Sequence, residues 1–336
     1  MDESRRALRY VVRMRFVFVM DPMTRVLPDK DTTFAFIRAA QRQGHESFHT
    51  QPHELFVQDG DVFATARPVS VSEEAPYFAL GQDTTLRMAD VSAVFIRKDP
   101  PFDVPYLYCT LLLERARDRT VIINDPRGLR DANEKLYALH FAKHMPKTWV
   151  GANRDLIFAF MKSVGGRAVI KPLHGAGGAG VLALSEGDKN NRSIVDLLTE
   201  EGTKTVMVQE FLPAVTEGDK RVILLNGEVL GAINRVPRGD DLRSNIHVGG
   251  TVEPCELSEA ERNVVKDLAP RLLADGLFFV GLDMIGGKLT EVNVTSPTGI
   301  QELSRHKGVD MAAKVIDWAV RRAEELHPNL KSIPPF

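Results

Sequence analysis

Four glycines within six residues, at positions 175, 177, 178 and 180, lie between two apolar segments. Such glycines let backbone N–H groups surround phosphate oxygens, because no Cβ atom intervenes. Gly175, Gly177 and Gly180 match G-x-G-x-x-G, but a dinucleotide-binding loop is followed directly by a helix, and residues 181–184 (VLAL) predict a strand. A Walker-type loop requires G-K-[ST], which is absent. We therefore predict a flap between antiparallel strands that covers a triphosphate; the alternative is a mobile turn without a ligand.

Lys171 ends the apolar segment before these glycines, directly ahead of Pro172. A lysine at the end of a strand is usually a solvated surface charge. Beside a phosphate-binding flap, however, its ammonium group is a compact charge that can reach a phosphate oxygen. The combination predicts that Lys171 contacts the phosphates.

Polar residues interrupt the apolar segment at 282–293 (LDMIGGKLTEVN). A buried carboxylate is costly unless it is paired or binds a metal. A two-residue turn at Gly286 and Gly287 would pair Asp283 with Thr290, whereas a three-residue loop over 286–288 pairs Asp283 with Glu291 and places Asn293 on the same face. We predict the three-residue loop, so that Asp283, Glu291 and Asn293 hold Mg²⁺ through oxygen atoms. The alternative is a solvated hairpin at the edge of a sheet.

The first part of the chain alternates predicted strands and helices, which indicates a parallel α/β sheet over about residues 14–130. Strands are predicted at 15–20, 62–71 (extended), 93–97 and 120–124, and helices at 32–43, capped by Asp31 and stopped by Gly44, and at 105–117.

The rest of the chain predicts an α+β arrangement with mainly antiparallel strands. Helices are expected at 131–144 (carrying Lys135), 154–164, 192–201, 258–275 and 310–326, with Ser258 and Glu261 forming a capping box. Strands are expected at 167–172, 181–185 and 205–209, followed by hairpins at 221–236, turning at Asn226-Gly227, and at 278–294.

Composition excludes several classes of protein. The length of 336 residues suits two or three domains, and a net charge of −2 gives no sign of a nucleic-acid or membrane partner. Two cysteines, Cys109 and Cys255, argue against a disulfide framework and fit a reducing cytoplasm. Residues 1–13 predict a basic, disordered extension, with Met14 as an alternative start, and the Pro-rich end at 333–336 is expected to fray.

Many motifs together resemble the ATP-grasp superfamily, and in particular its bacterial glutathione synthetase branch. The resemblance runs from about residue 14 to 320 and rests on VMDP (19–22), KDTTFAF (30–36), RKDPPFD (97–103), LRDANEKL (129–136), KPLHGAGGAG (171–180), QEFLP (209–213), GDKRV (218–222), R-x-N-x-x-x-G-G (243–250) and GLDMIGGKLTEVNVTSPTGI (281–300).

The resemblance implies an ATP-grasp fold preceded by a Rossmann-like parallel α/β domain. The implied divisions are an N-terminal domain over 14–131, a small ATP-grasp subdomain with the flap over 132–204, and a C-terminal subdomain with the metal site over 205–336. It also implies the ligation of γ-glutamylcysteine and glycine, with ATP giving ADP and phosphate through an acyl phosphate. Two Mg²⁺ ions, with Mn²⁺ as a substitute, and a homo-oligomer in the form of a tetramer are implied as well.

Site residues follow from the same resemblance. ATP is expected to contact Lys135, Lys171, Gly175, Gly177, Gly178, Asp219 near the ribose, and the hinge Gln209, Glu210, Phe211 and Leu212 beside the adenine. The reacting centre is expected to include Arg221, Arg235, Arg243, Asn245, Ser296 and Thr298, with Arg221 and Arg235 catalytic. The dipeptide is expected to face Asp21, Arg97 and Lys98. Two positions depart from the family pattern: His174 stands where aspartate is common, and Gln301 where arginine is frequent.

Three other functions remain as alternatives. A related ligase acting on another dipeptide or amine would share every motif above, and a screen of acceptor amines separates it. An ATP-binding regulator would be expected to lack the metal-binding residues or the arginines, which are present. A nicotinamide oxidoreductase rests only on the G-x-G-x-x-G match, and a nicotinamide titration tests it.

Overall fold

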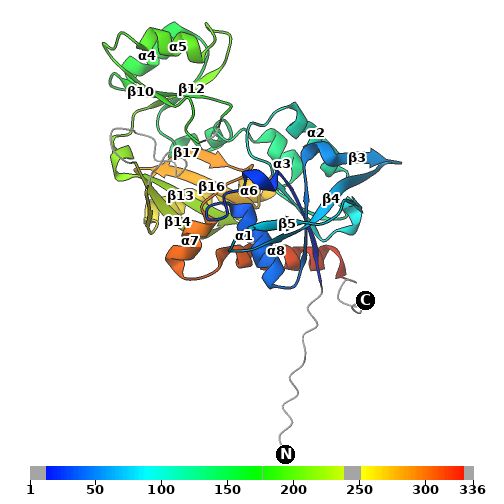
Figure 1. Ribbon diagram of the computed structural model, residues 1–336. Coiled ribbons are helices and arrows are strands. Elements are labelled where there is room, and N and C mark those ends of the chain that lie inside the picture. The colour runs from blue at the N-terminus through cyan, green and yellow to red at the C-terminus, as the bar shows by residue number, and fades with distance from the viewer. Residues whose placement is uncertain (1–12, 176, 238–250, 329–336) are drawn as a thin grey trace, which may run out of the picture.

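The computed structural model describes residues 13–175, 177–237 and 251–328. They form three β-sheets with helices packed around them (Figure 1). The predictions for residues 1–12 and 333–336 concern parts of the chain outside the described residues.

The first sheet is built around a parallel core in the order β2-β1-β7-β8. Every residue of β1 except the first is buried, as expected for an apolar strand covered on both faces. The bounds are β1 (Arg15–Met20), β2 (Glu46–Thr50), β7 (Ala93–Arg97) and β8 (Val121–Ile123). This core confirms the predicted parallel sheet.

Antiparallel strands extend this core into an eight-stranded mixed sheet. They are β3 (Leu55–Gln58), β4 (Asp61–Val71), β5 (Phe78–Leu80) and β6 (Thr84–Arg87), and β4 pairs antiparallel with β2. The extended segment predicted at 62–71 is confirmed as β4, but the expectation of a parallel sheet over residues 14–130 is wrong there, because β4 pairs antiparallel with each of its neighbours.

Three helices cover the first sheet. They are α1 (Thr32–Arg42), α2 (Val104–Glu114) and, from the end of the chain, α8 (Met311–Leu326). Asp31 caps α1 as predicted, because its Oδ1 accepts a hydrogen bond of 2.7 Å from the backbone of Phe34. Helix α8 packs against α1, β7 and β8, so the last helix completes the first domain (Figure 1).

The helix predicted over residues 131–144 is wrong. The chain instead forms α3 (Pro126–Asp131) and, after a turn, the 3₁₀ helix η4 (Tyr137–His144). Between them the Asn133 side chain accepts hydrogen bonds from the backbone of Lys135 (3.2 Å) and Leu136 (3.0 Å). Such local bonds compete with helix formation, so Lys135 lies in a turn.

The second sheet is small, antiparallel and ordered β11-β10-β12-β9. Its strands are β9 (Thr148–Gly151), β10 (Arg167–Pro172), β11 (Leu182–Ser185) and β12 (Val206–Glu210), with helices α4 (Arg154–Ser163) and α5 (Asn191–Leu198). These elements enclose a separate hydrophobic core and stand apart from the rest of the molecule in Figure 1. Because β12 pairs with both β10 and β9, a boundary at residue 204 would separate β12 from its own sheet.

The third sheet has the order β15-β14-β13-β16-β17 and is fully antiparallel. It comprises β13 (Asp219–Leu225), β14 (Glu228–Val236), β15 (Thr251–Pro254), β16 (Phe279–Ile285) and β17 (Lys288–Asn293), accompanied by α6 (Glu259–Ala274) and α7 (Ile300–Lys307). The turn at Asn226-Gly227 has positive φ at both residues (52° and 77°), as a two-residue type I′ hairpin requires. The predicted capping box of Ser258 and Glu261 begins α6.

Cys109 and Cys255 are both free thiols, in agreement with the prediction that no disulfide framework is present. Burial raises the pKa of the Cys109 thiol to about 12, so it is protonated at neutral pH. Among the helices that the structure describes, none has the length and apolar character needed to cross a bilayer.

Candidate active site

A cleft of about 1210 Å³ opens beside the second and third sheets and receives a few residues from the first domain. Most predicted site residues line it: Lys135, Lys171, Gly175, Gly177, Gly178, Gln209, Glu210, Phe211, Leu212, Asp219, Arg221, Arg235, Asp283, Glu291, Asn293, Ser296 and Thr298. The fold therefore brings together motifs separated by more than 100 residues of sequence.

The glycine-rich segment connects β10 to β11 and forms part of the cleft wall. Gly175, Gly177, Gly178 and Gly180 all have φ between 69° and 141°, a region that residues with a Cβ rarely adopt. The Lys135 ammonium donates a hydrogen bond of 3.3 Å to the Gly175 carbonyl. Strand β11 after the glycines confirms that this is not a dinucleotide-binding turn.

Lys171 is held against β12, the strand that pairs with its own strand β10. Its Nζ donates a hydrogen bond of 2.7 Å to the Gln209 side chain, whose Nε2 in turn donates to Thr148 (3.1 Å). Burial lowers the pKa of Lys171, and nearby Lys135 lowers it further, while Glu291 opposes both effects. An anion placed here would favour the charged form of the lysine.

The predicted hinge joins the second sheet to the third at the cleft wall. Glu210 accepts a hydrogen bond of 2.9 Å from the Lys147 backbone, and the Arg167 guanidinium lies 3.9 Å from the centre of the Phe211 ring. These contacts fix the backbone where the chain leaves β12.

The β16–β17 hairpin pairs Asp283 with Glu291 and Gly281 with Asn293, as predicted, so the three polar side chains share one face. The predicted three-residue loop is nevertheless wrong. Ile285 pairs with Lys288, which leaves a two-residue turn of Gly286 (φ 56°) and Gly287 (φ 75°). A bulge between Asp283 and Met284 leaves Thr290 as an extra residue, and this bulge restores the pairing of Asp283 with Glu291.

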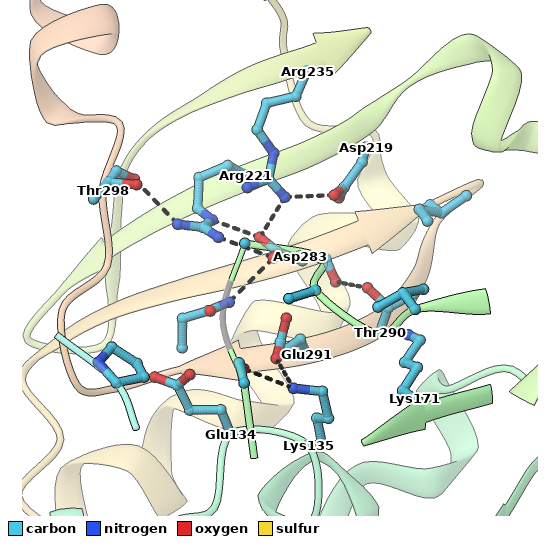
Figure 2. A pocket seen from close by; sticks show the side chains of 18 of the residues that line it. Glu134, Lys135, Lys171, Asp219, Arg221, Arg235, Asp283, Thr290, Glu291 and Thr298 are labelled. Carbon is cyan, nitrogen blue, oxygen red and sulfur yellow. Dashed lines mark hydrogen bonds and ion pairs between the residues drawn. The ribbon is translucent and has the colours of Figure 1, made fainter. Parts of the chain in front are cut away.

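Asp283 is the centre of a buried charge network (Figure 2). Arg221 binds it through two hydrogen bonds, Nε to Oδ1 (2.5 Å) and Nη2 to Oδ2 (2.9 Å), and Arg235 reaches Oδ1 at 3.0 Å. Burial opposes ionisation of Asp283, but the two arginines outweigh it and lower the pKa of the carboxyl group. Asp283 is therefore an anion at neutral pH.

Arg235 also binds Asp219 at 2.5 Å, and Arg221 donates to the Thr298 carbonyl at 3.2 Å. Burial disfavours the charge of Arg235, yet Asp219 and Asp283 together raise its pKa. The two guanidinium groups thus lie side by side over carboxylates, with Arg221 linked to the loop at 296–299 (Figure 2).

Glu291 and Asn293 complete the polar face of the hairpin. Glu291 pairs with Lys135 at 3.0 Å, and the Asn293 amide donates to Asp283 Oδ2 at 3.2 Å. Two carboxylates and an amide on facing strands are the oxygen donors that a hard divalent cation such as Mg²⁺ takes. The donor set fits the metal, and basic side chains neutralise both carboxylates in this structure.

Glu134 was missed from the sequence. Its Oε1 accepts hydrogen bonds from the backbone of Val294 (2.9 Å) and Thr295 (3.1 Å) and from the Thr295 hydroxyl (2.7 Å). Burial raises the pKa of Glu134, and the like charge of Glu291 adds to that effect. No sequence pattern predicts that a side chain will bind the backbone of a distant segment. The only signal for Glu134 was that it directly precedes Lys135, a predicted site residue.

Three predicted residues do not line the cleft. Asp21 pairs with Lys98 (3.2 Å) and accepts from the Asp99 backbone (3.0 Å). Arg97 is buried, donates to Thr33 (3.2 Å) and to the Pro297 carbonyl (3.0 Å), and so supports the loop that carries Ser296 and Thr298. Arg243 and Asn245 lie outside the described residues.

Of the two departures from the family pattern, His174 is exposed beside the glycines. Gln301 is buried, and its Nε2 donates to the carbonyls of Pro28 (2.9 Å) and Asp31 (2.6 Å). Gln301 therefore fixes α7 to the loop before α1.

Two family models cover this architecture. The model of the prokaryotic glutathione synthetase N-terminal domain matches residues 14–130, and the model of the prokaryotic glutathione synthetase ATP-grasp domain matches residues 134–308. The chain belongs to the prokaryotic glutathione synthetase family. Membership in this family confirms the resemblance on which the site was predicted.

Individual relatives agree with this family assignment. A glutathione synthetase of Synechocystis sp. is 45% identical over 316 residues, covering 91% of this chain and 98% of the relative. One of Mesorhizobium japonicum is 40% identical over 303 residues, covering 90% and 96%. A solved structure of the ATP-grasp ligase PsnB, complexed with minimal precursor, Mg and ADP, matches with a TM-score of 0.61 at 18% identity, covering 92% of this chain and 97% of that one.

The chain is accordingly an ATP-dependent ligase with an ATP-grasp fold, and its function is that of the glutathione synthetase family. ATP is a substrate in this family and Mg²⁺ its typical metal, and the oxygen donors of the hairpin suit that metal. The family match and strand β11 together argue against a nicotinamide oxidoreductase.

Proposed function

We propose that the cleft binds ATP, γ-glutamylcysteine and glycine and forms glutathione, ADP and phosphate through an acyl phosphate. A carboxylate is a poor electrophile, and transfer of the γ-phosphoryl group gives its carbon a leaving group. The glycine amine then attacks that carbon and displaces phosphate. The observation that carries the proposal is the pair of arginines, Arg221 and Arg235, gathered on Asp283 inside a cleft that also contains Lys135 and Lys171.

ATP occupies the part of the cleft between the flap and the hinge in this proposal. Lys135, Lys171 and the flap glycines Gly175, Gly177 and Gly178 hold the phosphates in this proposal, because both lysines and all three glycines line the cleft and Lys135 lies within hydrogen-bond distance of the flap. The hinge, residues 209–212, lies beside the adenine. Asp219 is placed near the ribose, and its ion pair with Arg235 orients its carboxylate.

Asp283, Glu291 and Asn293 would hold two Mg²⁺ ions, or Mn²⁺ in their place. A divalent cation bound there neutralises phosphate oxygens and polarises the phosphorus–oxygen bond that breaks. Lys135, which pairs with Glu291 at 3.0 Å in this structure, would then bind a phosphate oxygen instead.

Arg221 and Arg235 are assigned to the reacting centre. The dipeptide carboxylate and the γ-phosphate are both anions, and guanidinium groups cancel the repulsion between them. Arg221 also stands at the Thr298 carbonyl, so it is suited to hold the oxyanion of the tetrahedral intermediate next to the loop of Ser296 and Thr298. Arg243 and Asn245 are proposed to add to this centre, and Asp21, Arg97 and Lys98 to face the dipeptide or support its site.

Further parts of the proposal concern the setting of the reaction. The partners are small molecules together with further copies of the chain in a tetramer, and the reaction takes place in the cytoplasm. The two free thiols and the absence of a membrane-spanning helix among the described residues agree with this setting.

The decisive experiment is ADP release by the purified full chain with Mg²⁺, ATP and γ-glutamylcysteine, with and without glycine. We expect stoichiometric ADP and glutathione only when all substrates are present. A panel of other acceptor amines, including alanine, serine and β-alanine, tests whether glycine is the preferred one. Absence of ADP release with every amine would contradict the proposed function.

A further inference from the structure

One wall of the cleft carries charged side chains to which neither the sequence nor the family match gave a role in ligand binding. Glu302 lies in the first turn of α7, and Lys30 and Asp31 lie just before α1. Helix α7 lies beside α1 and far from β10 and β12, so this wall is remote from the flap (Figure 1). Hydrogen bonds from Gln301 to the carbonyls of Pro28 and Asp31 hold the two segments together.

Glu302 is a buried carboxylate, and one of its oxygens lacks a hydrogen-bond partner among the described residues. The residue is 5% exposed, and its Oε1 lies 3.4 Å from the Arg305 guanidinium. Its Oε2 has no hydrogen-bond partner among the residues that the structure describes. Burial raises the pKa of Glu302, while Arg305 and Lys30 oppose that effect. A buried carboxylate oxygen without a partner is costly, so this oxygen is poised for a group that arrives with a ligand.

Asp31 differs from Glu302, although both are acidic and both line the same wall. The Asp31 carboxylate caps α1, because its Oδ1 already accepts a local hydrogen bond from the Phe34 backbone. Lys30 is half-buried, and within the described parts of the chain its ammonium forms no ion pair. Within the described residues, this wall therefore combines a buried carboxylate oxygen without a hydrogen-bond partner, on Glu302, with an ammonium group without an ion pair, on Lys30.

A carboxylate oxygen that lacks a partner, together with an ammonium group, complements the end of a free α-amino acid, which carries an ammonium and a carboxylate on one carbon. We propose that Glu302 binds the α-ammonium group of the γ-glutamyl moiety and Lys30 binds its α-carboxylate. This inference rests on the proposed function and adds the subsite that recognises the amino-acid end of the dipeptide.

Glycine also has an amine and a carboxylate, but its amine must be unprotonated to attack the acyl phosphate. A carboxylate partner stabilises the protonated amine, which has no lone pair to donate. Glu302 would therefore hinder the reaction if it held glycine. Holding the γ-glutamyl α-amine as an ammonium group has the opposite consequence, since it keeps a competing nucleophile in the same substrate from reacting.

Two dipeptide analogues test the assignment. Glutaryl-cysteine lacks only the α-amine, and 4-aminobutyryl-cysteine lacks only the α-carboxylate. The full-length enzyme is assayed for glycine-dependent ADP release with γ-glutamylcysteine and each analogue, in the wild type, Glu302→Gln, Lys30→Met and the control Glu256→Gln. Glu256 is an exposed carboxylate that binds Lys307, a residue of α7 like Glu302, and it is not among the residues that line the cleft.

We expect the wild type to prefer γ-glutamylcysteine over both analogues by at least ~10-fold in kcat/KM, the scale of a lost charge-assisted hydrogen bond. Glu302→Gln should abolish the preference for γ-glutamylcysteine over glutaryl-cysteine but keep the preference over 4-aminobutyryl-cysteine. Lys30→Met should have the reverse effect. Both variants should raise KM for the dipeptide while KM for ATP stays constant, and Glu256→Gln should match the wild type.

An equal loss with γ-glutamylcysteine and glutaryl-cysteine in Glu302→Gln would overturn the subsite, because it would indicate a structural role. Equal kcat/KM values of the wild type for γ-glutamylcysteine and both analogues would overturn the subsite as well. Either result would leave the proposed function intact as long as γ-glutamylcysteine supports ADP release. Failure of the proposed function is distinct, since no substrate would then release ADP.

Discussion

At the scale of single residues, the site is organised by charges that compensate one another. Asp283 stays ionised although it is buried, because Arg221 and Arg235 both bind it. The same contacts hold two guanidinium groups in place before any substrate arrives. Such preorganisation means that little reorganisation is needed when the negative charge of the transition state develops.

Replacement of Arg221 by alanine should lower kcat by at least ~100-fold, the effect of losing one donor to a developing oxyanion. Arg221→Lys should recover little of the loss, because an ammonium group cannot reproduce the two bonds to Asp283. Steady-state kinetics with thermal unfolding as a folding check provide the measurement. The exposed Arg192→Ala serves as the matched control, and near-normal turnover of Arg221→Ala would show that its role is misassigned.

The lowered pKa of Lys171 predicts a pH effect. A lysine whose pKa in the folded protein lies below 10.5 loses its charge earlier than an ordinary lysine as the pH rises. kcat/KM for ATP, which reports on the free enzyme, should therefore decline on the alkaline side before pH 10.5. Lys171→Arg should extend the plateau to higher pH, because a guanidinium remains charged. Identical alkaline limbs in both enzymes would assign the decline to another group.

At the scale of elements, the β16–β17 hairpin shows what a sequence pattern can and cannot determine. Asp283, Glu291 and Asn293 were predicted to share a face, and the strand pairing confirms that they do. How the backbone achieves this pairing could not be predicted, since a longer loop and a short turn with a bulge give the same pairing. The two arrangements differ only in local backbone conformation. Two adjacent glycines are compatible with both, so the sequence could not distinguish a longer loop from a short turn with a bulge.

Gly287→Ala should lower the free energy of unfolding by about 1 kcal/mol, because an alanine at φ 75° is strained. No neighbouring atom would contact the added Cβ, so the strain is confined to the backbone and catalysis should be retained. Urea unfolding with activity measurements tests this, with the adjacent exposed Lys288→Ala as a control. A large loss of activity at unchanged stability would mean that the turn itself takes part in catalysis.

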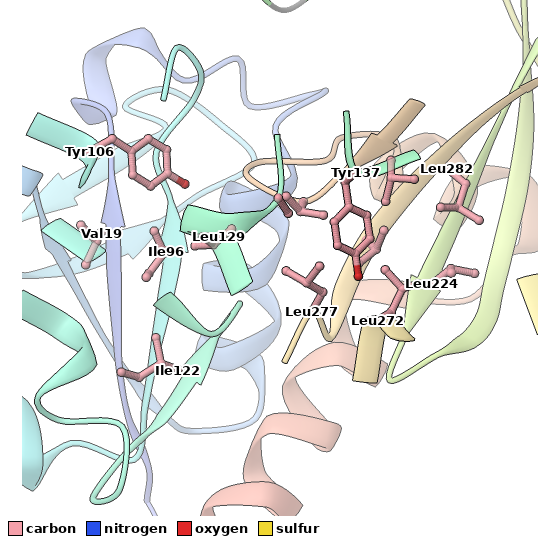
Figure 3. Close-up of a cluster of buried hydrophobic side chains, with 14 of the residues drawn as sticks. Val19, Ile96, Tyr106, Ile122, Leu129, Tyr137, Leu224, Leu272, Leu277 and Leu282 are labelled. Atoms are coloured by element: carbon pink, nitrogen blue, oxygen red, sulfur yellow. The ribbon is translucent and has the colours of Figure 1, made fainter. Parts of the chain in front are cut away.

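At the scale of the whole molecule, one hydrophobic core joins the first domain to the third sheet. Side chains from the first sheet, such as Ile96 and Ile122, belong to the same cluster as Leu224 and Leu282 (Figure 3). Asn124 adds a polar junction, since its side chain exchanges four hydrogen bonds of 2.7 to 2.8 Å with the backbone of Phe278, Phe279 and Val294. Local sequence patterns predicted the separate layers, but contacts across about 150 residues have no local signature.

Asn124→Ala should cost about 3 kcal/mol of unfolding free energy, because it leaves several buried backbone groups without partners. Chemical denaturation gives the measurement, and the exposed Asn190→Ala should be near neutral. An effect below that of an ordinary surface substitution would show that water or a rearranged backbone replaces these bonds.

The position of helix α8 has a consequence for biosynthesis. Phe16, Phe34 and Phe36 of the first domain share a buried cluster with Val315, Ile316 and Trp318 of α8. While the ribosome is still translating the middle of the chain, the newly emerged first domain lacks that cover and exposes aromatic side chains to the cell. Folding of the nascent protein is therefore completed only near release, and a message truncated before codon 311 would yield a product prone to aggregate.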